Sequence, residues 1–227
     1  MSTDVEIGNL ALSLIGDEAT LISLSPPEGS VQADLVASFY PIARDTLLTS
    51  HDWGFNTTRA NGQPVDAPLS GWQYAYARPS LALRIISVIP LGSTDDYISP
   101  PPAGTITLAD GSYASPVNGG GLDQEQPFAQ EIDATGREII VTNQSTAIIR
   151  YTVKITDTTK FSPLFVTALS YLLASYIAGP IIKGDKGRKT AADMMQMSAT
   201  YSNLAVAIDA SQQKIEPEHQ VSWITGR

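Results

Sequence analysis

Apolar residues recur at every third or fourth position near both ends of the chain, and this spacing predicts four helices. The first opens on the capping box Thr3-Asp4-Val5-Glu6, carries one apolar face through Ile15 and ends at Gly16. The second begins at Ser30 and ends near His51. Pro41 lies inside this second pattern, so we expect it to kink or split the helix.

A second pair of helices is predicted in the last third of the chain. Ser162 is the expected cap of the third helix and Pro163 its first residue, and Gly179-Pro180 is expected to end or bend it. The fourth helix is expected after a turn at 183–189. Its apolar stripe comprises Ala191, Met194 or Met195, Ser198, Tyr201, Ala205 and Ile208.

The pattern changes to period two in the middle of the chain, which also holds more than half of the prolines and glycines. Alternation is clearest at 149–155 and present at 83–89, and both segments predict strands. Residues 137–141 and 105–108 are weaker strand candidates. The polar, glycine-rich stretch 112–130 predicts an extended loop.

Each helix pair alone would leave apolar faces uncovered, so the two pairs are expected to pack together. We therefore predict an α+β fold, a four-helix bundle with a β-rich domain inserted between helices 2 and 3. The predicted domains are a discontinuous bundle of residues 1–54 and 160–213, an insert of residues 55–159 and a C-terminal tail of residues 214–227.

The third helix carries no charge between residues 161 and 182 and is long enough to span a bilayer. Thr167, Ser170 and Ser175 interrupt its apolar run, however, and the central helix of a bundle is also apolar on all sides. We favour the core helix over a membrane span.

Charge is scarce and unevenly distributed along the chain. The net charge is −9, only 16% of residues are charged, and residues 1–55 hold eight acids against one base. Such a low charge content favours a subunit that buries much of its exterior against partners. The acidic balance argues against binding nucleic acid by neutralising phosphates, and the absence of cysteine excludes disulfides and thiolate chemistry.

The segment 184–190 has the glycines and the lysine of a phosphate-binding loop, but Arg188 stands where the second glycine belongs and a strand does not precede it. We interpret it as a basic turn between helices. Its cations could pair with an acidic partner surface, which makes a candidate subunit interface of Lys183, Lys186, Arg188 and Lys189.

The sequence contains little evidence for catalytic residues. His51 precedes Asp52, but no nucleophile elbow accompanies the pair, and His51 suits the negative end of a helix. Carboxylates that could in principle serve glycoside hydrolysis are Asp95, Asp96, Glu125, Glu131 and Asp133, and we interpret these as solvated. We predict no catalytic, cofactor-binding or metal-binding residue and no cofactor.

Aromatic residues are densest at 71–76. In an extended conformation Trp72, Tyr74 and Tyr76 would share one face. We expect these rings, together with Trp53, to pack where the bundle meets the insert, and a carbohydrate platform is the less favoured alternative.

Several of these segments together resemble the tail tubular protein A family, the head-to-tail adaptors of short-tailed phages. The resembling segments are Ala11-Leu12-Ser13-Leu14-Ile15-Gly16, Tyr40-Pro41-Ile42-Ala43-Arg44-Asp45, His51-Asp52-Trp53-Gly54-Phe55, Gly71-Trp72-Gln73-Tyr74-Ala75-Tyr76 with Arg78-Pro79-Ser80, and Phe161-Ser162-Pro163-Leu164-Phe165. Asp52 replaces the proline of the family's His-Pro-Trp element, and Leu81 stands where aspartate is common. The segments occur in the family's order.

The resemblance implies a structural virion protein of the tail or neck. It would be a homo-oligomer, expected to be a dodecameric ring, that binds the portal protein, receives the tail nozzle protein and extends the channel for genomic DNA. The expected location is the virion, with the host cytoplasm during assembly. Met1-Ser2-Thr3-Asp4 has neither the basic nor the apolar stretch of a signal peptide, so no secretion signal is expected.

Within this framework the tail is a candidate portal-binding segment, through Lys214, Ile215, Val221, Trp223 and Ile224. The alternative function is a cell-wall glycan hydrolase of a phage tail, for which the carboxylates above are the motivation.

Overall fold

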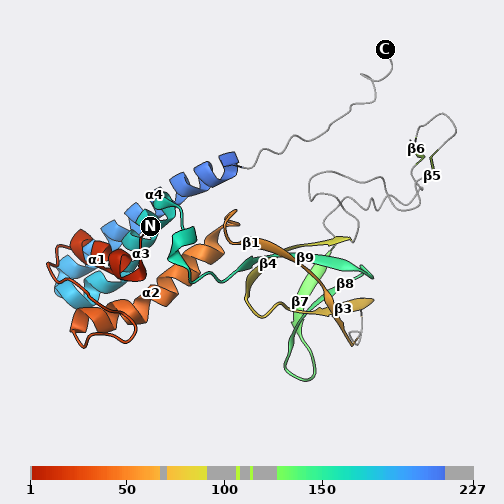
Figure 1. The fold of residues 1–227 in the computed structure, drawn as a ribbon, viewed down its shortest axis with the longest axis horizontal. Coiled ribbons are helices and arrows are strands. Elements are labelled where there is room, and N and C mark those ends of the chain that lie inside the picture. Colours follow the sequence, from red (N-terminus) through yellow and green to blue (C-terminus); the bar gives the residue numbers. More distant parts are fainter. Residues whose placement is uncertain (1, 67–70, 91–105, 108–112, 115–126, 213–227) are drawn as a thin grey trace, which may run out of the picture. The chain divides into compact units, whose positions relative to one another are not determined.

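The computed structural model of the protein describes residues 2–66, 71–90, 106–107, 113–114 and 127–212 (Figure 1). Within these residues, four α-helices and antiparallel β-sheets give the protein the mixed α+β class that the sequence predicts. The chain divides into two compact units. The helical unit comprises Met1–Thr57 and Thr152–Gln213, and the β-rich unit is centred on Thr58–Tyr151.

The helical unit contains α1 (Asp4–Leu14), α2 (Val31–Ser50), the short 3-10 helix η1 (Thr158–Lys160), α3 (Pro163–Ile182) and α4 (Gly184–Gln212). The predicted starts of α1, α2 and α3 are confirmed by their hydrogen bonds. In α1 the Thr3 hydroxyl accepts from the Glu6 N–H and the Glu6 carboxylate accepts from the Thr3 N–H. Ser30 and Ser162 cap α2 and α3 in the same way.

Two prolines leave their helices more continuous than expected. α2 runs through Pro41 without being split, and α3 continues past Gly179 and Pro180 to Ile182. A proline in the last turn of a helix removes only one hydrogen bond close to an end where the ladder is already incomplete. Of the two outcomes predicted at Gly179-Pro180, an end or a bend, the end is therefore wrong.

The predicted basic turn at 183–189 is also wrong, because α4 begins at Gly184. The connection is reduced to Lys183, which has a φ of 60° and whose N–H donates to the Gly179 carbonyl. Gly187 then brings the first turn of α4 close to the end of α3. A Cβ at Gly187 would lie 3.2 Å from the Ala178 carbonyl oxygen and 3.4 Å from that of Gly179.

α3 packs against α1, α2 and α4, which explains why it is apolar on every side. Eleven of its twenty residues are buried, among them Phe165, Leu169, Leu173 and Ile177. Its length and hydropathy also satisfy the criteria for a membrane span, a test that the core helix of a soluble protein passes equally. The burial of α3 supports the interpretation as a core helix.

α4 contributes only a narrow face to this core. Among its residues Gly187, Ser198 and Ala205 are buried, and the Ser198 hydroxyl donates to the Ala168 carbonyl at 2.9 Å. Ile208, which the sequence placed on the same stripe, is 51% exposed.

The β-rich unit contains a four-stranded antiparallel sheet in the order β2-β3-β8-β7 and a three-stranded sheet in the order β1-β9-β4. The strands are β1 (Thr57–Asn61), β2 (Gln63–Val65), β3 (Tyr74–Ala77), β4 (Ala82–Pro90), β7 (Phe128–Ile132), β8 (Glu138–Thr142) and β9 (Ala147–Val153), with the short pair β5 (Ile106–Thr107) and β6 (Tyr113–Ala114).

The predicted strands at 83–89, 137–141 and 149–155 correspond to β4, β8 and β9, and 105–108 to the shorter β5. The predicted loop 112–130 is wrong at both ends, because β6 and the start of β7 lie within it; its residues 115–126 lie outside the described ones. The strict alternation expected in β9 also fails. Thr152 is fully buried although it is polar, and Tyr151 is only partly buried.

Candidate interaction surface

Four aromatic side chains from two distant segments meet in the helical unit, and we call Trp53, Phe55, Phe161 and Phe165 the aromatic corner. Phe165 contacts both Trp53 and Phe55 edge to face, with ring centroids 5.2 Å apart in each pair. The ring centroid of Phe161 lies 4.8 Å from that of Phe165. Such geometry is favoured by the ring quadrupoles and adds to the burial of large apolar surface. The corner joins the end of α2 to the start of α3.

Hydrogen bonds hold the segment after α2 against the last turn of that helix. The indole N–H of Trp53, which is fully buried, donates to the Leu47 carbonyl at 2.9 Å. The side-chain amide of Asn56 donates to the Leu48 carbonyl at 3.1 Å. These side chains satisfy carbonyls that a helix end leaves without intrahelical donors. The corner is therefore positioned by the chain's own helix termination.

The C-terminal end of α4 is attached to the same segment through Asp209. Its Oδ2 accepts a hydrogen bond from the Gly54 backbone N–H at 2.9 Å and lies 3.8 Å from the Nε2 of His51. His51 ends α2, as predicted, and its ring meets that of Trp53 edge to face at 5.0 Å. The sequence offered the neighbouring Asp52 as a partner for His51, a pairing that we did not favour. In the structure the Asp209 carboxylate lies 3.8 Å from the His51 Nε2. No short-range pattern could have indicated a partner so far along the chain.

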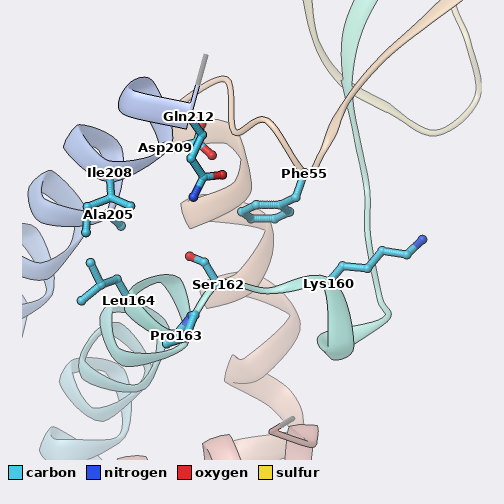
Figure 2. Close-up of a pocket in the computed structure, with 9 residues that line it drawn as sticks. All are labelled: Phe55, Lys160, Ser162, Pro163, Leu164, Ala205, Ile208, Asp209 and Gln212. Atoms are coloured by element: carbon cyan, nitrogen blue, oxygen red, sulfur yellow. The ribbon is translucent and has the colours of Figure 1, made fainter. Parts of the chain in front are cut away.

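A pocket of about 360 Å³ lies beside the aromatic corner (Figure 2). The Phe55 ring forms one side, and α4 forms the opposite side with Ala205 and Ile208. Asp209 and Gln212 lie at the α4 end, while the Lys160 side chain extends away from the opening. The remaining lining residues are Ser162, Pro163 and Leu164. Sequence reasoning did not identify this pocket, because its walls come from three separate segments.

The predicted subunit-interface residues gather at the other end of α3. Lys183, Lys186, Arg188 and Lys189 are all exposed, so they are available to a partner. The Arg188 guanidinium pairs with the Asp185 carboxylate, both strongly exposed, and such a surface pair contributes little to stability. Lys186, Arg188 and Lys189 lie on α4, which holds them at fixed spacing, and Lys183 immediately precedes this helix.

One of the resembling segments, Tyr40–Asp45, carries a partly buried charge network. The Arg44 guanidinium is 8% exposed and pairs with Asp45 at 2.8 Å, and Asp45 also pairs with the Lys154 ammonium at 2.6 Å. Burial raises the pKa of Tyr40 to about 12, although the nearby Arg44 cation opposes this shift. The network connects α2 to the segment that follows β9.

Asp133, one of the acids considered for glycoside hydrolysis, has a structural role. Asp133 caps the β7–β8 turn. Its carboxylate accepts hydrogen bonds from the Thr135 hydroxyl at 2.5 Å and from the backbone N–H of Arg137 at 2.9 Å. These hydrogen bonds, the Thr135 hydroxyl foremost, hold the pKa of Asp133 far below its ordinary value. A carboxyl held in its ionised form is unsuited to donate a proton, so Asp133 is a turn residue.

Glu131 lies on β7 near Glu138, whose carboxylate is engaged by Arg78 at 2.6 Å. Asp95, Asp96 and Glu125 lie outside the described residues. Within the part of the chain that the structure describes, no group of three or more histidine, aspartate or glutamate side chains is arranged to hold a metal ion.

The aromatic residues of the β-rich unit do not form one face. Tyr76 is 3% exposed and belongs to a core cluster with Val88, Ile140 and Ile149. Trp72 packs instead against the cluster of Ala75, Ile139 and Val141, and Tyr74 is exposed. Trp72 does not share a face with the two tyrosines, because strand β3 begins only at Tyr74, after Gly71 has taken a φ of 84°. Trp53 is buried in the helical unit.

The candidate portal-binding residues Lys214, Ile215, Val221, Trp223 and Ile224 lie outside the described residues. No family model matches this chain, and no curated protein is significantly similar to it.

Proposed function

We propose that this chain is a structural virion protein, a head-to-tail adaptor that forms a ring between the portal and the tail nozzle of a short-tailed phage. The main support is the contact between two of the segments that resemble the adaptor family. Residues 51–55 and 161–165 lie far apart in sequence, yet they supply all four rings of the aromatic corner. This is the outcome expected if both segments belong to one structural element of that family.

The finer architecture in this proposal is a four-helix bundle with a β-rich domain inserted between helices 2 and 3. Helices from both sides of the β-rich stretch belong to one compact unit, and α3 packs against the other three. The Asp209–Gly54 hydrogen bond and the Arg44–Asp45–Lys154 network also join the two halves. These contacts favour a bundle completed by both ends of the chain.

Ring assembly needs two different, complementary surfaces on each subunit, because neighbours in a closed ring meet head to tail. The exposed cations on Lys183, Lys186 and Lys189 form one candidate surface. The excess of acids in residues 1–55 supplies an opposite charge, with Asp4, Glu6 and Asp34 in the first turns of α1 and α2. Charge complementarity of this kind directs association more than it strengthens it.

The net charge of −9 suits a channel component that DNA passes without adhering. Partners in this proposal are further copies of the chain, the portal, the nozzle and genomic DNA without sequence-specific binding. No membrane partner is proposed.

The decisive experiment measures mass and symmetry of the purified chain alone and after mixing with portal rings. The proposal predicts a monomer that becomes a ring only on the portal, seen by light scattering and by averaged electron micrographs. A chain that stays monomeric and fails to sediment with portal rings would refute it. Clearing of cell-wall suspensions by that monomer would favour the hydrolase instead.

Charge reversal tests which surface forms the ring. Lys186→Glu combined with Lys189→Glu should reduce ring assembly on the portal by about tenfold or more, because two carboxylates then replace the cations and repel an acidic neighbour. Lys160→Glu reverses one charge beyond the opposite end of α3 and is the matched control for the single variant Lys186→Glu. Equal loss with the control would show that overall charge, and not this surface, governs assembly.

A further inference from the structure

The pocket beside the aromatic corner has the properties of a binding site for one large side chain. Its apolar lining comes from Phe55, Leu164, Ala205, Ile208 and Pro163. The Ile208 side chain is 51% exposed in the described part of the chain, so it presents apolar surface to solvent at the edge of the pocket. A volume of about 360 Å³ lies within the range of sites that bury small ligands or anchor residues. An aromatic side chain supplies the largest apolar surface that a single residue can place in such a pocket.

The polar groups in the pocket narrow the choice of side chain. The Asp209 carboxylate accepts the Gly54 N–H at one oxygen, and a carboxylate has room for several donors. A side chain that is apolar over its body and ends in one N–H donor would satisfy both the wall and this acceptor. Tryptophan has that combination.

The position of the pocket indicates where such a side chain comes from. Gln212, the last residue of α4, lies on the pocket wall, so the C-terminal end of this helix borders the pocket (Figure 2). Fifteen residues follow, 213–227, and Trp223 is the eleventh of them. An extended segment of that length reaches roughly 35 Å, far more than a return to the pocket requires.

We propose that this pocket binds the chain's own C-terminal segment, with Trp223 as the side chain that fills it. Val221 and Ile224 flank this tryptophan in an otherwise polar stretch and would cover the apolar surface around Ile208. Attachment to the same chain raises the effective concentration of the segment to about the millimolar range, so even a weak site would be occupied. Docking of the segment in its own subunit is therefore favoured over docking in a second copy.

This inference stands apart from the proposed adaptor function, because it concerns the chain alone. If both hold, the portal and the pocket compete for the same apolar residues, and the docked tail is released only when the portal binds it.

The test uses the full chain with fluorotryptophan in place of its three tryptophans, and the Trp223 signal is assigned from a Trp223→Phe variant. In the wild type the signal should differ from that of a free peptide of residues 213–227. Ile208→Glu places a second carboxylate in the pocket beside Asp209 and should move the signal to the free-peptide position. Leu204→Glu is the matched control, since Leu204 is 50% exposed on the same helix but does not line the pocket.

A second measurement leaves the pocket untouched and so does not depend on the folding of Ile208→Glu. A labelled peptide of residues 213–227 should bind the full-length Trp223→Ala variant at least tenfold more tightly than wild type, whose own tail occupies the site. A wild-type Trp223 signal identical to the free peptide, or equal peptide binding to both chains, overturns the proposal. A Trp223 signal that changes with protein concentration, together with a doubled mass, assigns the pocket to the tail of a second copy and also overturns it.

Discussion

The backbone N–H of Gly54 donates a hydrogen bond to the Asp209 carboxylate at 2.9 Å, across 155 residues of sequence. The contact connects the segment after α2 to the last turns of α4. The Asp209 side chain is 12% exposed, so this charge-assisted hydrogen bond is partly shielded from water. Next to it a Cβ at Gly54 would lie 3.3 Å from the other carboxylate oxygen, which explains why a glycine fits there.

Replacement of this acid should destabilise the helical unit. We expect Asp209→Ala to lower the free energy of unfolding by about 1–2 kcal/mol, because the Gly54 N–H loses a charged acceptor. Urea unfolding followed by circular dichroism measures the change. Asp193→Ala removes an exposed acid from the same helix and should alter stability by less than about 0.5 kcal/mol. Equal effects of the two substitutions would contradict the role of this hydrogen bond.

Two glycines at the α3–α4 hairpin should differ in their sensitivity to substitution. Gly187→Val drives a branched side chain against the Ala178 carbonyl, and we expect a loss of about 1–3 kcal/mol. Gly179→Ala meets no atom within 4 Å apart from its chain neighbours, but a Cβ before Pro180 is disfavoured in a helix, which offsets the gain in helix propensity. We expect it to change stability by less than about 1 kcal/mol. Thermal unfolding of the two variants compares them directly. A stable Gly187→Val protein would show that the helices separate there without penalty.

The Arg44–Asp45–Lys154 network should be sensitive to the loss of its central acid. Asp45→Ala leaves the Arg44 guanidinium, 8% exposed, without the carboxylate that pairs with it, and should cost about 1–3 kcal/mol of unfolding free energy. Lys154→Ala removes a 40% exposed cation from the same carboxylate and should cost at most about 1 kcal/mol. Urea unfolding of both variants tests the order. The reverse order would mean that Arg44 does not depend on Asp45.

The β7–β8 turn should lose stability in acid because of Asp133. The folded-state pKa of this carboxyl lies below its unfolded value of 3.8, so its contribution is complete above that pH and is lost as pH falls toward the folded pKa. Thr135→Val deletes the hydroxyl donor that contributes most to the shift, and should raise the Asp133 pKa toward its ordinary value. Carbon NMR of the labelled carboxyl through an acid titration follows this change. An unaltered titration midpoint in Thr135→Val would contradict the assigned cause.

The starts of α1, α2 and α3 and the end of α1 were predictable from sequence because the groups that form them are neighbours. The Thr3–Glu6 capping box, the Ser30 and Ser162 caps and the stop at Gly16 each depend on hydrogen bonds or backbone angles within a few residues. The same holds for the class of the fold, since period-3.6 and period-2 segments report which face each element buries. Strand β2 was missed because it is three residues long and contains Pro64, which gives no usable period.

The pocket and its surroundings were decided only by tertiary structure. Nothing local to His51 or Gly54 indicates that Asp209 lies beside them, and the start of α4 at Gly184 depends on the room that Gly187 leaves against α3. The burial of Thr152 likewise overrides the alternation of β9. Sequence patterns report the local energetics of single elements, whereas these features depend on contacts made when distant elements pack, and such contacts carry no short-range signature.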